Sequence, residues 1–157
     1  MKIVVASDHA GFDLKAAVVR YLEERRIPCE DFGCGPGEKA DYVDFAEKAV
    51  RAVQSGACDR AILVCGTGIG MSMAANKFRG IRATPCWTPY TADRARRHND
   101  SNCLTMGGRV LTEAEGLAIV GIWLETPFEG GRHRRRLDKL AALEARACHD
   151  EIGENPR

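Results

Sequence analysis

The chain has 157 residues, a length that suits one compact domain rather than two. Hydrophobic residues make up 45% of it and charged residues 29%, which is ordinary for a globular protein and argues against a disordered or fibrous chain. The formal net charge of +1 excludes a whole-molecule attraction to nucleic acid or to an anionic membrane.

Short apolar runs alternate along the chain with helical patterns, from a strand after Met1 to a final helix that begins near Gly131. The predicted strands cover 2–7, 27–33, 59–65, 80–86 and 101–107, and the predicted helices 11–26, 42–56, 69–78, 88–98, 111–125 and 131–148.

Five strands separated by helices predict right-handed crossovers and a parallel sheet with helices on both faces. We therefore expect an α/β protein with a three-layer, doubly wound (Rossmann-like) five-stranded sheet and an extra C-terminal helix. A single domain should cover 1–150, and 151–157 should form a flexible tail.

The sequence also bears on the compartment. The first apolar run, 3–6, is far shorter than a signal-peptide core of about 7 to 15 residues, and no stretch is long enough for a membrane span. The seven cysteines form neither the CxxC pairs of a zinc site nor a compact disulfide framework. We expect a cytoplasmic protein with packed free thiols at the cysteines other than Cys65.

In doubly wound sheets, ligands bind beyond the carboxyl ends of the strands. This rule selects residues 7–9 after the first strand, 65–70 after the third, and the residues that follow the fourth and fifth strands. The stretch "ILVCGTGIGMS", residues 62–72, is the most informative of these, because alternating glycines can turn successive N–H groups toward one anion.

The glycine pattern excludes several familiar phosphate loops. A dinucleotide site needs GxGxxG and an acidic residue about 20 positions later, whereas here the glycines run GxGxG and no acid occurs between Asp59 and Asp93. No GK[ST] follows, and a cysteine phosphatase would need arginine where Met71 stands. All charged side chains from Arg60 to Ala92 are cationic, which favours an anionic small molecule.

Two interpretations of Cys65 remain open on these grounds. It is either a small residue that closes a buried strand, or a thiolate stabilised by loop amides and by the following helix.

The chain resembles the type B ribose-5-phosphate isomerases, a family that also contains galactose-6-phosphate isomerase subunits. The similarity is collinear over residues 2 to about 145. The motifs that carry it are "SDHAGF", "DY" at 41–42, "CGTGIGMSMAANK", "GIRA", "RRHNDSN", "GGRV" and "EGGRHRRR".

The resemblance implies conversion of an aldose phosphate to its ketose phosphate through a cis-enediolate, without a metal or organic cofactor. It implies that Cys65 is the base, that Thr67 assists the proton transfer and that His98 opens the sugar ring. Some relatives carry a carboxylate where this chain has Met71, so the thiolate assignment stands here. The implied substrate ligands are Asp8, His9, Tyr42, Gly66, Gly68, Ile69, Gly70, Asn99, Arg109, Arg132 and Arg136.

Local sequence offers simpler roles for several of these residues. Asp8 could cap a helix, His98 could be a helix C-terminal cation, and Tyr42 could be a half-buried packing residue. Arg132 and Arg136 are four apart, so one helix face could present both to a phosphate, with Arg109 assisting. We expect His133, Arg134 and Arg135 to be solvated.

Relatives are homodimers, sometimes paired into tetramers, with shared active sites. Leu137, Leu140 and Leu143 predict an apolar stripe that a partner subunit could cover. The leading hypothesis is ribose 5-phosphate isomerisation in the pentose phosphate pathway. The alternatives are the same chemistry on allose or galactose 6-phosphate or on a tetrulose 4-phosphate, and a non-catalytic nucleotide or nucleic-acid binding module that uses "RHRRR".

Overall fold

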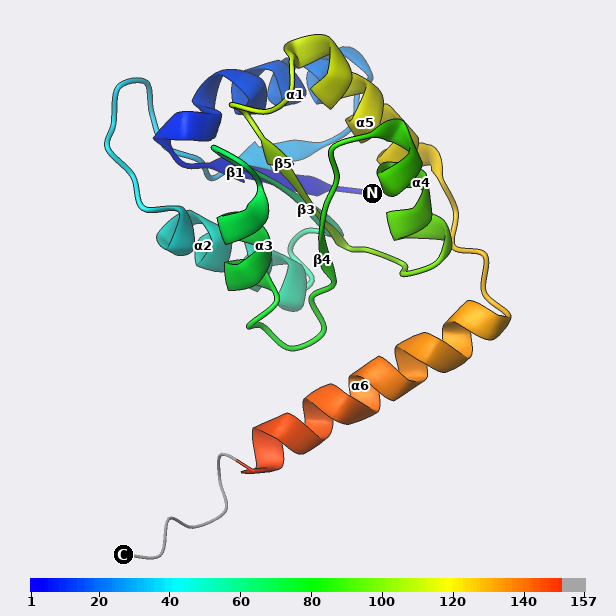
Figure 1. Cartoon of the computed structure of the whole chain (residues 1–157). Helices are drawn as coiled ribbons and strands as arrows, with labels where there is room; N and C mark the ends of the chain where they lie inside the picture. Colours follow the sequence, from blue (N-terminus) through cyan, green and yellow to red (C-terminus); the bar gives the residue numbers. More distant parts are fainter. Residues whose placement is uncertain (151–157) are drawn as a thin grey trace, which may run out of the picture.

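The computed structural model describes residues 1–150, with side chains through residue 147 (Figure 1). The tail predicted at 151–157 lies outside the described residues. Five parallel strands form one sheet in the order β2-β1-β3-β5-β4. The strands are β1 Ile3–Ser7, β2 Cys29–Asp31, β3 Arg60–Cys65, β4 Ala83–Pro85 and β5 Cys103–Gly107.

Helices cover both faces of the sheet. Helices α1, α4 and α5 lie on one face, and α2 and α3 lie on the other (Figure 1). The helices are η1 His9–Gly11 (a 3₁₀ turn), α1 Phe12–Glu24, α2 Tyr42–Gln54, α3 Ile69–Ala75, α4 Pro89–Arg97, α5 Glu113–Glu125 and α6 Arg132–Asp150. The predicted three-layer, doubly wound fold with an extra C-terminal helix is confirmed.

Burial explains why the central strands appear as continuous apolar runs in the sequence. Alternate residues of a strand point to opposite faces, and here both faces are covered. Val5 and Ile62 join the core beneath α1 and α5, whereas Val4 and Leu63 join the core beneath α2 and α3. The edge strands β2 and β4 have three residues each, shorter than the predicted ranges, and Pro85 has no N–H with which to extend its ladder.

The strand order defines where a ligand can bind. From β1 the chain crosses to β2 on one side, whereas β3 lies on the other side of β1. The connections that leave β1 and β3 therefore diverge at the carboxyl edge of the sheet, and such divergence opens a crevice. Residues 7–9 and 65–70 follow these two strands.

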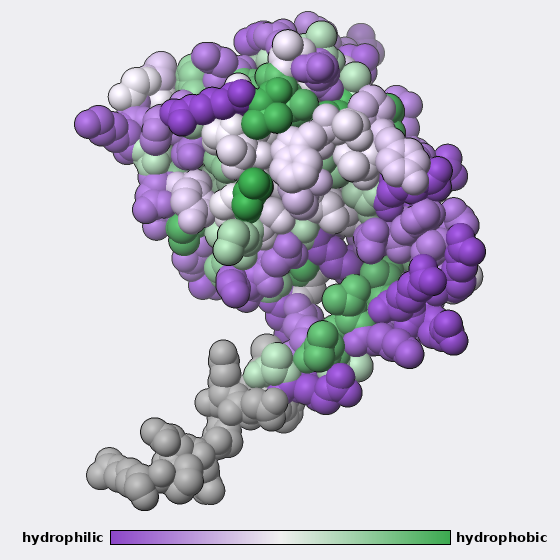
Figure 2. Space-filling model, in the orientation of Figure 1, coloured by the Kyte–Doolittle hydropathy of each residue, from purple (hydrophilic) through white to green (hydrophobic). Residues whose placement is uncertain are grey.

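Helix α6 projects away from the sheet, and apolar side chains lie along it (Figure 1, Figure 2). Of the predicted stripe, Leu137 is buried, while Leu140 and Leu143 are 53% and 56% exposed. These leucines line a groove of about 640 Å³ between α6 and residues 76–82. Among the described helices, none has the length and apolarity to cross a membrane.

Candidate active site

The glycine loop, residues 66–70, joins β3 to α3. Gly68 caps α3 with φ of +84°, in the left-handed region. A Cβ atom at this position would lie 2.9 Å from the Met106 backbone of the neighbouring strand β5. Glycine is therefore required here for both conformation and space.

The sulfur of Cys65 lies beneath this loop. The side chain is only 5% exposed, and the Gly68 N–H donates to its Sγ at an N···S distance of 3.1 Å. The next amide, that of Ile69, donates to Thr67 Oγ1 at 3.3 Å. The sulfur thus belongs to the core cluster on one side and to the amide loop on the other.

Asp8 and His9 border the loop from the end of β1. Asp8 caps η1, because its Oδ1 accepts from the N–H groups of Ala10 and Gly11 at 2.9 and 3.1 Å. His9 is exposed, and its Nδ1 lies 3.1 Å from the Ala40 carbonyl oxygen. If Nδ1 carries the proton and donates there, Nε2 is left as an acceptor.

Tyr42 and Arg109 complete this side of the sheet. A Cβ at Gly70 would meet the Tyr42 ring at 2.9 Å, so the ring packs directly on the loop. The Arg109 side chain lies against Gly66, and the backbone N–H of Arg109 donates to the Gly66 carbonyl at 3.0 Å. We name this group the carboxyl-edge cluster: Asp8, His9, Tyr42, Cys65, Gly66, Thr67, Gly68, Ile69, Gly70 and Arg109.

The remaining predicted site residues lie together elsewhere. His98 caps the C-terminal end of α4, and its N–H donates to the Arg94 carbonyl at 3.0 Å. Arg132 and Arg136 are both exposed, one turn apart on α6. Asn99 follows His98 and is exposed, with its carbonyl accepting from Arg82 at 3.2 Å. We name His98, Asn99, Glu129, Arg132, His133 and Arg136 the amino-edge cluster.

The two clusters lie at opposite ends of the sheet. Helices α4 and α5 run back from the carboxyl edge, and Arg60 at the start of β3 donates to the Leu124 carbonyl near the end of α5 at 3.4 Å. β3 has six residues, so about 16 Å of strand separates its two ends. One chain therefore does not bring His98 to Cys65, nor Arg132 and Arg136 to Arg109.

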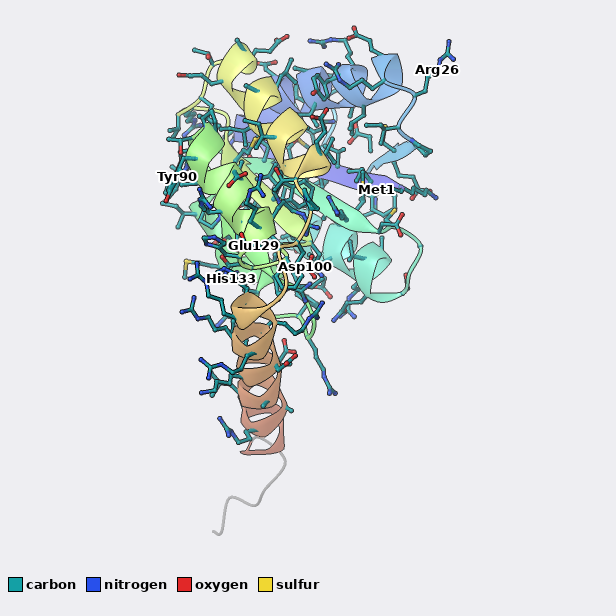
Figure 3. The ribbon with its side chains drawn as sticks, turned by 90° about the vertical axis from the view of Figure 1, so that its right-hand side faces the viewer. Met1, Arg26, Tyr90, Asp100, Glu129 and His133 are labelled. Carbon is teal, nitrogen blue, oxygen red and sulfur yellow. The ribbon has the colours of Figure 1, made fainter. Side chains whose placement is uncertain are left out.

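His133 corrects the sequence analysis, which placed it among solvated residues. It is 2% exposed, and its ring stacks on His98 with centroids 4.1 Å apart and planes 7° apart. Glu129 lies 3.8 Å from His133 Nε2 and 4.0 Å from His98 Nε2, and Figure 3 shows Glu129 and His133 side by side at the start of α6. The signal was present in the sequence, because His133 and the buried Leu137 share a helix face. Arg134 and Arg135 are exposed, as predicted.

The electrostatics of this pair have clear causes. Burial lowers the pKa of His133, and the nearby charges of His98 and Arg132 lower that pKa further. Both histidines also meet guanidinium groups: Arg94 Nη1 lies 3.3 Å from His98 Nε2, and Arg132 Nε lies 3.3 Å from His133 Nε2. A neutral His133 is thus favoured beside these cations.

Among the described residues, His98, Glu129 and His133 place their ligand atoms within 4.8 Å of one another, near enough to consider a metal ion. The lone pair of an imidazole nitrogen lies in the plane of its ring, and these two rings are nearly parallel and stacked, so one ion cannot lie in both planes. With Arg94 and Arg132 against the same nitrogens, the cluster suits a proton or an anion better than a cation.

These features define a class: a doubly wound α/β protein with a glycine loop at the switch point of its sheet and a separate histidine–arginine cluster. The profile of the Ribose/Galactose Isomerase family matches residues 3–140, and the chain belongs to this family of sugar-phosphate isomerases. Membership of an enzyme family disfavours the alternative of a non-catalytic nucleotide or nucleic-acid binding module.

Individual relatives agree with this assignment. The chain is 45% identical to ribose-5-phosphate isomerase B of Escherichia coli, over 92% of this chain and 97% of that protein. It is 37% identical to D-erythrulose-4-phosphate isomerase of Pectobacterium atrosepticum, over 95% and 99% of the two chains. Its structure is similar to that of ribose-5-phosphate isomerase B from Clostridium thermocellum, with a TM-score of 0.92, 46% identity, and coverage of 94% and 99%.

Proposed function

We propose that this protein interconverts ribose 5-phosphate and ribulose 5-phosphate through a cis-enediolate, in the pentose phosphate pathway. The similarity to ribose-5-phosphate isomerases from Escherichia coli and Clostridium thermocellum supports this substrate. The observation that carries the chemistry is the Gly68 N–H aimed at Cys65 Sγ, 3.1 Å away at the end of a buried strand.

In this proposal Cys65 acts as a thiolate base. It removes the proton from C2 of the aldose, the C–H electron pair forms the C1=C2 bond, and the carbonyl oxygen at C1 takes the negative charge. The proton of the C2 hydroxyl then passes to the oxygen at C1, the C1=C2 electron pair takes the proton back from Cys65 at C1, and C2 becomes the carbonyl of the ketose. Loop amides at the start of α3 stabilise both the thiolate and the enediolate, because a glycine loop brings backbone donors close to the reacting atoms. Thr67 assists the proton transfer.

The other residues bind and open the sugar. Asp8, His9 and Tyr42 hold the sugar at the carboxyl edge, beside Gly66, Gly68, Ile69 and Gly70. His98 donates the proton that opens the furanose ring, and Asn99 binds the sugar beside it. Arg132 and Arg136 bind the phosphate from one face of α6, with Arg109 assisting, because guanidinium groups match phosphate oxygens. No metal or organic cofactor takes part.

We further propose that the active site is formed by two chains of a homodimer. The separation between the two clusters supports this, since neither contains both a base and a ring-opening acid. The exposed Leu140 and Leu143 beside the groove along α6 supply an apolar surface that a second chain would cover. A cytoplasmic location suits the six described cysteines, which are free.

Replacing Cys65 by alanine tests the base. We expect kcat for ribose 5-phosphate to fall by about two to four orders of magnitude, as is typical for loss of a general base. Binding of the sugar phosphate, measured by calorimetry, should persist because the phosphate ligands are unchanged. Near-normal turnover would refute the role of Cys65. The matched control is Cys58→Ala, another buried thiol, at which turnover should be unchanged.

The same chemistry on a four-carbon substrate is the second candidate. The relative from Pectobacterium atrosepticum, an erythrulose-phosphate isomerase, favours testing it. Steady-state kinetics with tetrose, pentose and hexose phosphates should give the highest kcat/KM for ribose 5-phosphate. A higher value for D-erythrulose 4-phosphate or for allose 6-phosphate would overturn the ribose assignment and keep the mechanism.

A further inference from the structure

We propose that Trp87 is a positioning residue for the base: its indole N–H fixes the Thr67–Gly68 peptide so that the Gly68 N–H points at Cys65 Sγ. This inference rests on the proposed role of Cys65. Trp87 lies just after β4, on a segment separated from the glycine loop by 20 residues of sequence.

The indole of Trp87 contacts the same peptide unit that donates to the Cys65 sulfur. Trp87 Nε1 donates to the Thr67 carbonyl oxygen at 2.9 Å. The Gly68 N–H, which donates to Cys65 Sγ at 3.1 Å, belongs to the same peptide unit. In a trans peptide the C=O and N–H point in opposite directions, and the described chain has no cis bonds. The indole and the sulfur therefore hold the two ends of one rigid plane.

The neighbouring peptides are held differently. The carbonyls of Cys65 and Gly66 accept from the backbone N–H groups of Gly108 and Arg109 at 2.8 and 3.0 Å, and that of Gly68 accepts from Ser72 at 3.1 Å. These bonds belong to the backbone and do not depend on side-chain identity. At the Thr67 carbonyl the donor is a side chain, so the residue at position 87 decides how this peptide is held.

The peptide needs such a restraint, because it precedes a glycine. Rotation about the bonds flanking the Thr67–Gly68 peptide would turn its N–H away from the sulfur, and glycine opposes such a rotation less than any other residue. The Thr67 side chain is already engaged, since its Oγ1 accepts from Ile69 at 3.3 Å. A hydrogen bond to the carbonyl also polarises the peptide and strengthens the N–H as a donor.

Trp87 is well placed to act as a fixed anchor. The next residues form the capping box of α4, in which the Thr88 and Thr91 side chains each bond the other residue's N–H, with Pro89 at the first helical position. This rigid start holds the backbone on which the indole stands. Trp87 is 40% exposed, so changing it should leave the core intact.

The test replaces Trp87 by phenylalanine, which keeps an aromatic ring and removes the N–H donor. We expect kcat/KM to fall about 3- to 10-fold, the value of one hydrogen bond, with the loss mainly in kcat. The acidic limb of the pH profile of kcat/KM should move to higher pH, because a less stabilised thiolate is protonated at a higher pH. A purely structural role would lower the melting temperature without moving this limb.

A second readout follows the sulfur itself. Trypsin should release residues 61–77, in which Cys65 is the one cysteine, so mass spectrometry can follow its alkylation by iodoacetamide as a function of pH. The alkylation profile should move in the same direction as the kinetic one. The matched control is Tyr90→Phe, which also removes one polar hydrogen from an exposed aromatic ring in this segment and should leave both profiles unchanged. Trp87→Leu gives a second variant if the first proves unstable.

Unaltered kinetic and alkylation profiles in Trp87→Phe would overturn this inference. If Cys65→Ala is inactive in that case, the proposed base stands and only the anchor is wrong. If Cys65→Ala retains turnover, the proposed function fails first, whatever Trp87 does.

Discussion

At the scale of single residues, two glycines share a left-handed backbone conformation but differ in what surrounds them. Gly56 and Gly68 have nearly the same φ, +76° and +84°. A Cβ at Gly56 would meet nothing within 4 Å, whereas one at Gly68 would meet the Met106 backbone. The two glycines therefore form a natural comparison, with equal backbone strain and unequal surroundings.

Gly68→Ala should lower kcat/KM by at least about 100-fold, because the loop must move away from β5 and would carry the Gly68 N–H away from the sulfur. Gly56→Ala should cost a similar strain of about 1 kcal/mol in the free energy of unfolding and leave kcat/KM unchanged. Kinetics and thermal unfolding of both variants test this. Equal activity in the two would mean that the loop geometry is not catalytic.

The buried His133 predicts a pH dependence of stability. Its pKa is lowered in the folded protein by burial and by the neighbouring His98 and Arg132, while Arg136 acts in the same direction and Glu129 opposes them. The unfolded chain therefore binds more protons at this position, and stability falls as the pH drops below about 6.5.

In His133→Gln this contribution is absent, so the melting temperature should change less between pH 7.5 and pH 5.5 than in the unmodified protein. Other titrating groups are common to both chains and cancel in the comparison. An equal pH response would contradict the assignment of a neutral His133.

At the scale of elements, the helices that return from the carboxyl edge begin with strong caps. Helix α5 starts with a capping box in which Thr112 and Glu115 bond each other's backbone N–H groups. The hydrogen bonds that the Glu115 carboxylate accepts from the Thr112 backbone and side chain lower the pKa of Glu115. The stability that they contribute is therefore present above about pH 4.5 and is lost as the pH falls through the lowered pKa. Helix α5 leads to the amino-edge cluster, where the Glu129 N–H donates to the Arg97 carbonyl at 3.0 Å.

Thr112→Ala should lower the free energy of unfolding by about 1 kcal/mol, which corresponds to a fall in melting temperature of about 2–4 °C for a chain of this length. Glu113→Ala is the control, since it removes a carboxylate from the same turn. The ion pair of Glu113 with Arg20 is exposed and 3.7 Å long, so its loss should cost little. A larger loss in the control would show that charge, and not capping, stabilises this end of α5.

At the scale of the whole molecule, the sheet separates the carboxyl-edge cluster from the amino-edge cluster. Parallel strands place every strand end at one edge, and the helices that follow them end at the other edge. Cys65 is the last residue of strand β3, whereas His98 directly follows helix α4. In the proposed dimer, one chain supplies the carboxyl-edge cluster of each site and its partner supplies the amino-edge cluster.

Co-expression of Cys65→Ala with His98→Gln tests this arrangement. If each site uses Cys65 of one chain and His98 of the other, a mixed dimer retains one intact site, and random pairing should restore roughly one quarter of the activity on ribose 5-phosphate. The control pair is Cys65→Ala with Gly68→Ala, both in the carboxyl-edge cluster, which should restore none. Failure of the first pair to recover would refute a site formed from two chains.

Much of this arrangement could be predicted from the sequence, because the relevant signals are local. Apolar runs and helical periodicity located the strands and helices, although the edge strands are shorter than expected, since pairing on one side does not hold their ends. The alternating glycines placed the loop against Cys65. The position of His98 at the amino edge was also within reach, because it follows a helix that returns from the end of a parallel strand.

The sequence by itself determined the layered fold, the glycine loop and the types of residue available for isomerisation, since each depends on patterns a few residues long. Only the tertiary structure decided that the His133 ring stacks on His98 and that Trp87 reaches Thr67 across 20 residues of sequence. These facts depend on how distant segments pack in three dimensions, and no local pattern specifies that packing.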